Sequence, residues 1–168
     1  MKRKCAWCGK DMGPVPGTRD DGVTHGICRD CRNFFERNVP GELADFMDGM
    51  DVPVMLVDFE AKLLAANRTA RRQMRLAQEK IEGSLPGDVV ECRWARLPGG
   101  CGKQTHCLGC VLRACVNKTF ETGQSIFRQE AWLDRMTPDG KDRRVRLVVS
   151  TVKRNEVVFM RIDGWEPD

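Results

Sequence analysis

Short apolar runs separated by turn residues dominate the chain after residue 50. The run at 52–57, bounded by Asp51 and Asp58, predicts a buried strand, and a tight connection leads to a second strand over 62–66. Beyond residue 120, segments rich in valine, leucine and isoleucine predict three more strands, at 125–133, 143–153 and 157–162. A strand pair, a helical middle and three closing antiparallel strands predict an α+β fold, in which helices cover one face of a five-stranded antiparallel sheet.

Apolar residues at helical spacing predict two helices between these strands. The first begins at Asn67, and its apolar face consists of Ala66, Ala70, Met74, Ala77 and Ile81. The opposite face is basic, with Arg68, Arg71, Arg72 and Arg75. Such a stripe is typical of a solvated face, and contact with nucleic acid is the less favoured interpretation. The second helix is expected to begin at 105–110 and to end at Gly123, so that Cys107 and Cys110 lie on its first turn.

The segment 37–50 is expected to be a hinge followed by a short amphipathic helix. A helical tail over 33–38 is predicted to end at Val39-Pro40-Gly41. Apolar residues then recur with the spacing of one helix face, at Leu43, Phe46, Met47 and Met50. We interpret this face as packing on its own domain, and a contact between two copies of the chain is the alternative.

The cysteine content distinguishes an otherwise ordinary composition. The chain has 168 residues with nine cysteines, and its 41% hydrophobic and 31% charged residues are typical of a globular protein. No apolar run approaches the roughly 18 residues of a membrane span, and no apolar leader follows the basic start, so we expect a cytoplasmic location. Thiols stay reduced there, and closely spaced pairs then indicate metal binding or redox chemistry.

Four of the cysteines form two pairs with the spacing of metal knuckles. Cys5 and Cys8 form the first pair, and Cys28 and Cys31 form the second. Two such turns present four thiolates to one ion, about 2.3 Å from each sulfur, which predicts a structural Zn²⁺ site; a redox dithiol or an iron–sulfur centre is the alternative. Gly9 follows the first pair, where a knuckle turn favours positive φ. The segment has little apolar surface, so we expect the metal to supply most of its folding free energy.

The two knuckles also carry a resemblance to a known kind of segment. They read Cys5-Ala-Trp-Cys8-Gly-Lys and Thr24-His25-Gly26-Ile27-Cys28-Arg-Asp-Cys31. These two motifs resemble a short zinc-ribbon-like segment that is attached to bacterial sensory and response-regulator proteins. The resemblance implies a small metal-stabilised module over 1–36. His25 is a fifth candidate ligand, and we expect it beside the ion or at the surface. The module carries eight basic and eight acidic side chains within residues 1–50, and this neutrality disfavours binding to nucleic acid.

The order of elements in the remainder resembles a PAS domain over about residues 44–163. The opening hairpin, Val57-Asp58-Phe59-Glu60-Ala61-Lys62 through Asn67, and the Asp139-Gly140 turn between closing strands carry the resemblance. Ala61 stands where the family often has glycine. The resemblance implies a non-catalytic sensory domain, which we expect over 51–165. A cysteine-rich insert at 92–115 replaces or expands the helical middle of that domain.

A second set of cysteines is spread over this insert, at Cys92, Cys101, Cys107 and Cys110. Three states fit these four thiols: a second Zn²⁺ site, a [4Fe–4S] or [2Fe–2S] cluster, and a switch that forms reversible disulfides. His106 is a possible accessory ligand in place of Cys92. Cys115 lies deeper in the predicted helix and is expected to be a core residue. The segment from Gly100 to Arg113 is similar to a cysteine-rich variant found in PAS proteins of anaerobic bacteria.

These features predict a regulatory protein of bacterial signal transduction that has no catalytic activity. It would sense redox state or hold metal at its cysteine insert, and it would pass the signal to a partner protein or through a homodimer. The alternatives are a transcription-linked zinc module that binds DNA or RNA polymerase, and a purely structural protein–protein adaptor. An enzyme with Cys107 as nucleophile is the least favoured hypothesis, because the chain has two histidines and no paired-carboxylate pattern.

Overall fold

The chain divides into two compact units, which are described separately. The computed structural model describes residues 1–5, 7–17, 22–31, 40–75, 81, 83–137 and 139–167; the predicted helical tail at 33–38 lies outside this part of the chain. The first unit spans Met1–Met50 and the second spans Asp51–Asp168.

The first unit is built on a small three-stranded sheet with the order β2-β1-β3. Its central strand β1 (Lys2–Cys5) pairs antiparallel with β2 (Asp11–Pro14) and parallel with β3 (Val23–Gly26). Among the described residues up to position 31, the buried hydrophobic side chains are Trp7 and three cysteines, Cys5, Cys28 and Cys31. The interior of this part of the unit therefore consists largely of the predicted metal ligands.

A short helix, α2 (Pro40–Asp48), ends the first unit. Pro40 was expected to terminate the preceding helical tail, but it is the first residue of α2, where its missing N–H and fixed φ are tolerated. Met47 and Met50 on the predicted apolar face are buried, whereas Leu43 and Phe46 are partly exposed.

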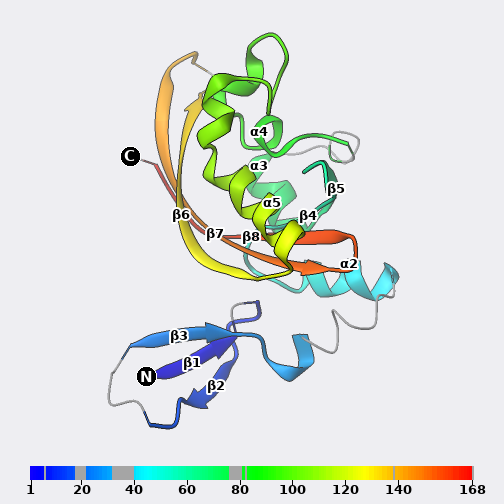
Figure 1. Ribbon diagram of the computed structural model, residues 1–168, viewed down its shortest axis with the longest axis vertical. Helices are drawn as coiled ribbons and strands as arrows, with labels where there is room; N and C mark the ends of the chain where they lie inside the picture. Colours follow the sequence, from blue (N-terminus) through cyan, green and yellow to red (C-terminus); the bar gives the residue numbers. More distant parts are fainter. Residues whose placement is uncertain are drawn as a thin grey trace. The chain divides into compact units, whose positions relative to one another are not determined.

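The second unit contains the predicted five-stranded antiparallel sheet, with the order β5-β4-β8-β7-β6. Its strands are β4 (Val54–Val57), β5 (Leu63–Ala66), β6 (Ile126–Met136), β7 (Asp142–Arg154) and β8 (Val157–Pro167). The chain's last strand thus lies at the centre of the sheet, between β4 of the opening hairpin and β7. The long strands β6, β7 and β8 curve together around the helices in Figure 1.

The helical middle covers one face of this sheet, as the sequence predicted. It consists of α3 (Arg68–Met74), α4 (Pro86–Val89), the 3-10 turns η2 (Arg93–Arg96) and η3 (Thr105–Gly109), and α5 (Val111–Thr122). Figure 1 shows α5 lying across the curved sheet, on the same side as α3 and α4. Leu112, Cys115 and Val116 of α5 belong to one buried cluster with residues of all five strands. The prediction that Cys115 is a core residue is therefore confirmed.

Two buried polar contacts hold the helices to the sheet. The Asn67 side chain caps α3, because its Oδ1 accepts from the Ala70 N–H at 2.8 Å and from the Val54 N–H at 3.0 Å. Its Nδ2 donates to the Val52 carbonyl at 2.9 Å, which ties the start of α3 to the opening strand. On α5, the Thr119 hydroxyl meets that of Thr151 on β7 at 2.7 Å. Buried polar groups are tolerated only when they are paired in this way.

The boundaries of three predicted elements differ most from the structure. The helix that follows Asn67 ends at Met74, because Arg75 takes a left-handed conformation with φ 52°. The second helix begins at Val111 rather than within 105–110, so the prediction that Cys107 lies on its first turn is wrong: Cys107 lies in η3, and Cys110 is the N-cap of α5. Strand β8 extends to Pro167, well beyond 162, because it stays paired with the long strand β7.

Candidate functional site

The first cysteine set is held at the end of a strand pair. Cys5 ends β1 in register with Gly26 of β3, so the chain after β3 brings Cys28 beside Cys5. The Gly9 N–H donates to the Cys5 carbonyl at 3.0 Å, closing a knuckle turn in which Gly9 has φ 72°. The predicted need for glycine after the first pair is therefore confirmed.

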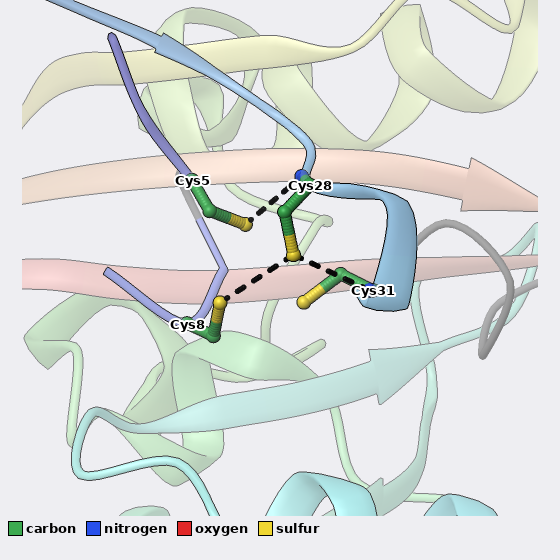
Figure 2. A group of neighbouring side chains, drawn as sticks. All are labelled: Cys5, Cys8, Cys28 and Cys31. Atoms are coloured by element: carbon green, nitrogen blue, oxygen red, sulfur yellow. Dashed lines mark hydrogen bonds between the residues drawn. The ribbon is translucent and has the colours of Figure 1, made fainter. Parts of the chain in front are cut away.

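The four sulfurs converge on one point. Sγ atoms of Cys5, Cys8, Cys28 and Cys31 all lie within 4.8 Å of one another, and Figure 2 shows the four side chains turned inward. The Sγ atoms of Cys8 and Cys28 are 3.7 Å apart. A tetrahedral ion 2.3 Å from each ligand separates its sulfurs by about 3.8 Å. The four residues therefore have the spacing of a tetrahedral tetrathiolate site and could hold a metal ion.

Hydrogen bonds in this cluster favour negative charge on sulfur. A hydrogen bond from the Cys31 thiol, followed by backbone N–H donors that include Cys28 at 3.3 Å, lowers the pKa of Cys5 to about 4. The same contact with Cys5 raises the pKa of Cys31, and desolvation raises the pKa of Cys8. These contacts favour a thiolate at Cys5, and a divalent ion at the centre of the cluster would compensate further negative charge.

His25 lies in β3, where its backbone is in register with Lys4. The structure describes its backbone and not its side chain. The predicted accessory role of His25 therefore stays a prediction.

The second cysteine set is distributed over three neighbouring turns of the second unit. Cys92 precedes η2, Cys101 lies in the loop before η3, Cys107 lies in η3, and Cys110 joins η3 to α5. All four side chains are half-buried. In the described part of the chain, only the N-terminal set has three or more ligand atoms that all lie within 4.8 Å. The second set is therefore more open than the first.

Backbone N–H groups lie near three of these four sulfurs. The Gly102 N–H donates to the Cys107 sulfur at 3.2 Å. The backbone at residues 94 and 95 acts to lower the pKa of Cys92, and the backbone at Gly87 acts to lower the pKa of Cys101. At Gly87 a Cβ would lie only 2.6 Å from the Cys101 sulfur, so this close approach requires glycine. Donors of this kind stabilise negative charge on sulfur.

Burial has the opposite effect on the pKa of two of these thiols. Desolvation is the largest effect on Cys92 and on Cys101, and it raises the pKa of both. The charges of Cys107 and Cys110 raise both values further, so the four groups lie close enough to influence one another. Cys92 and Cys101 are consequently neutral thiols at pH 7 unless a cation or an oxidant changes their state.

The insert is attached to the sheet by contacts that the sequence did not reveal. Cys92 forms an antiparallel bridge with Arg135 of β6, and the Arg135 Nε donates to Glu91 at 2.9 Å. Trp94 donates from Nε1 to Asp134 at 3.3 Å, which adds a second link to β6. No motif marks these pairs, since they join residues about forty positions apart in the chain.

The imidazole ring of His106 packs against the indole ring of Trp94. The two rings are stacked, with centroids 3.6 Å apart and an interplanar angle of 18°. This contact joins η3, which carries Cys107, to η2, which follows Cys92. The structure thus gives His106 a packing role between the two turns, and its predicted role as a ligand stays a prediction.

Comparison with solved structures identifies the fold of the second unit. A domain of a sensory box sensor histidine kinase/response regulator from Geobacter sulfurreducens matches 74% of this chain over 92% of its own length, with 10% identity and a TM-score of 0.50. The PAS domain of nitrogen regulation protein NR(II) from Vibrio parahaemolyticus matches 73% of this chain over 96% of its own, with 14% identity and a TM-score of 0.46.

The PAS domain of Bordetella pertussis BvgS matches 76% of this chain over 85% of its own, with 14% identity and a TM-score of 0.45. No family model matches the chain, and a search of curated proteins found no relative. At these identities the similarity establishes the fold alone. Residues 51–167 have the PAS fold, and the four-cysteine cluster of the first unit precedes it.

None of the helices in the described part of the chain is long and apolar enough to span a membrane.

Proposed function

We propose that the protein is a non-catalytic regulatory protein of bacterial signal transduction, in which Cys92, Cys101, Cys107 and Cys110 sense redox state by holding or releasing a metal. A structural Zn²⁺ bound by Cys5, Cys8, Cys28 and Cys31 stabilises the N-terminal module. The signal passes to a partner protein or through a homodimer. The cytoplasm is the expected location, because its reducing conditions keep these thiols available.

The observation that carries the proposal is the proximity of four half-buried cysteines that come from neighbouring turns. The charges of Cys107 and Cys110 raise the pKa of both Cys92 and Cys101, so the four sulfurs lie near enough to influence one another. The Gly102 N–H donates to the Cys107 sulfur at 3.2 Å, a contact that favours a thiolate there. A single cation bound among these cysteines would offset the desolvation that keeps Cys92 and Cys101 protonated.

Oxidation provides the change of state. Peroxide can convert two metal-bound thiolates into a disulfide: the two sulfurs lose two electrons, and one H₂O₂ takes these electrons and two protons from solvent to become two H₂O molecules. A pair that has become a disulfide no longer offers two thiolates, so the metal would be released. The sensing step thus needs an external oxidant and two protons from water.

The contacts of Cys92 support transmission to the sheet. Because Cys92 bridges Arg135, a shift of Cys92 on metal loss would move residues 91–94 against β6. Strand β6 is at the edge of the sheet, where a partner can read such a change. One of the neighbours named above is a domain of a sensory box sensor histidine kinase/response regulator, which fits a signalling role for this fold.

The test is a metal and thiol analysis of protein purified without oxygen. We expect one equivalent of Zn²⁺ from the first site, together with additional metal and, for a cluster, acid-labile sulfide and a brown colour. Peroxide should release the additional metal and lower the number of titratable thiols by two or more. One equivalent of Zn²⁺ alone, with thiols that peroxide leaves unchanged, would contradict the sensing function.

A further inference from the structure

A pocket of about 340 Å³ opens beside Cys101, at the junction of the opening hairpin, α5 and the cysteine insert. It is lined by Glu60, Lys62, Leu85, Cys101, Gly102, Lys103 and Arg113. This volume is at the lower end of the range found for small-molecule sites, which extends from roughly 300 to 1,000 Å³. The pocket is therefore suited to a small ligand.

The lining is strongly cationic. Lys62, Lys103 and Arg113 contribute three positive charges, and Glu60 is the only carboxylate among the lining residues. Lys62 forms an exposed ion pair with Glu60, with Nζ and Oε2 2.5 Å apart. Within the described residues, the side chains of Lys103 and Arg113 have neither a hydrogen bond nor an ion pair. Two cations thus remain available to an incoming anion.

The Arg113 guanidinium lies beside Gly102. An ideal Cβ at position 102 would come within 2.2 Å of its Nη1, so a side chain there would displace the guanidinium. Gly102 also has φ 85°, a conformation that favours glycine. Arg113 belongs to the first turn of α5, whose N-terminal end is the positive end of the helix dipole. The N-terminal end of α5 thus adds a second source of positive potential at this end of the pocket.

We propose that this pocket binds a small oxyanion, a carboxylate or a phosphate, between Lys103 and Arg113. A guanidinium presents paired N–H donors that match the two oxygens of a carboxylate or phosphate, and lysine adds a point charge. Lys62 can contribute once the anion competes for it with Glu60. The site adjoins the proposed sensor through Cys101, but binding requires neither metal nor an oxidised thiol.

The test titrates inorganic phosphate, and separately succinate, into the full chain at constant ionic strength, with calorimetric detection. Wild-type protein should bind at least one of these anions at a single site. The Lys103→Gln/Arg113→Gln double variant should lose about tenfold or more in affinity, as expected for removal of charge-assisted hydrogen bonds. The matched control Arg96→Gln/Lys118→Gln removes the same charge from exposed residues outside the pocket, and it should change the affinity less than about twofold.

A second measurement, of backbone amide chemical shifts in the wild-type protein during the anion titration, tests the proposal even if the double variant folds poorly. Anion binding should shift the amide signals of Gly102, Lys103 and Arg113 together, with one saturation curve. Binding of phosphate alone or of succinate alone would identify the preferred oxyanion. The proposal is overturned if neither anion saturates a site, if both double variants bind equally, or if the shifts lie elsewhere. These results leave the metal and thiol analysis unaffected, so the two proposals can fail separately.

Discussion

The two cysteine sets contain four ligand candidates each, yet they occupy very different surroundings. In the first unit, the cysteines account for most of the buried apolar residues described up to position 31. In the second unit, Cys92, Cys101, Cys107 and Cys110 lie at the margin of a domain with the PAS fold and its own extensive buried cluster. We infer that the first set is needed for folding, whereas the second set can change its state while the domain remains folded.

The largest expected effect tests the first half of this comparison. Cys28→Ser removes a buried ligand from a module that has little other core. Structural zinc binding contributes on the order of 10 kcal/mol in small modules, so we expect residues 1–31 to unfold. Amide spectra should lose the dispersed signals of this segment, and the zinc content should fall by one equivalent. Cys115→Ala is the control, since it removes a thiol that belongs to neither set. A module that stays folded in Cys28→Ser would show that metal is not its main source of stability.

The second prediction asks whether the PAS unit is stabilised by its own framework. Asn67→Ala removes an N-cap and leaves the Val54 N–H and the Val52 carbonyl without the side chain that pairs with them. We expect the free energy of unfolding of the second unit to fall by about 3 kcal/mol. Urea denaturation measures this loss, while the zinc content of the first unit stays constant. Asn117→Ala on α5 is the comparison variant and should change stability by less than about 0.5 kcal/mol. Equal effects of the two substitutions would contradict the role of the Asn67 contacts.

The third prediction addresses the second cysteine set directly. Cys92→Ser should abolish the additional metal and the peroxide response, yet lower the stability of the metal-free PAS unit by only about 1 kcal/mol, since the core cluster is retained. Metal analysis and urea denaturation of chelator-treated protein give the two values. A loss greater than about 4 kcal/mol in the metal-free unit would mark Cys92 as a structural residue and remove the distinction between the two sets.

The smallest effects concern two turns with positive φ, one in each unit. Gly9→Ala places a methyl group on a knuckle residue with φ 72° and should weaken zinc binding by about 1–2 kcal/mol, as chelator competition would measure. Ala61 already occupies φ 61° in the PAS hairpin and is buried. Ala61→Gly removes backbone strain but also a buried methyl group, so the change in urea stability should stay within about 1 kcal/mol. A greater effect at Ala61 than at Gly9 would reverse the expected difference between the units.

Much of the fold could be predicted because its signals are local. Asn67 after an apolar strand predicted the start of α3, and Gly123 predicted the end of α5. The two-residue cysteine spacing predicted the first site, since each pair forms one turn and only two turns must meet. The start of α5 was misplaced because Cys107 lies in the 3-10 turn η3, whose spacing resembles that of a helix, and Cys110 is only the N-cap of α5. The contact of Arg113 with Gly102 and the stacking of His106 on Trp94 depend on how separate turns pack together. Such packing leaves no periodic pattern in the chain.

The sequence by itself determined the class of the sheet, its five strands, the helical face and the first cysteine cluster, because apolar periodicity and turn chemistry act over a few neighbouring residues. Only the tertiary structure decided which residues surround the second cysteine set. The bridge from Cys92 to Arg135, the close approach of Cys101 to Gly87 and the cationic pocket around Arg113 all join separate segments. Their geometry follows from how the insert packs on the sheet, and that packing depends on the shape of the whole PAS core.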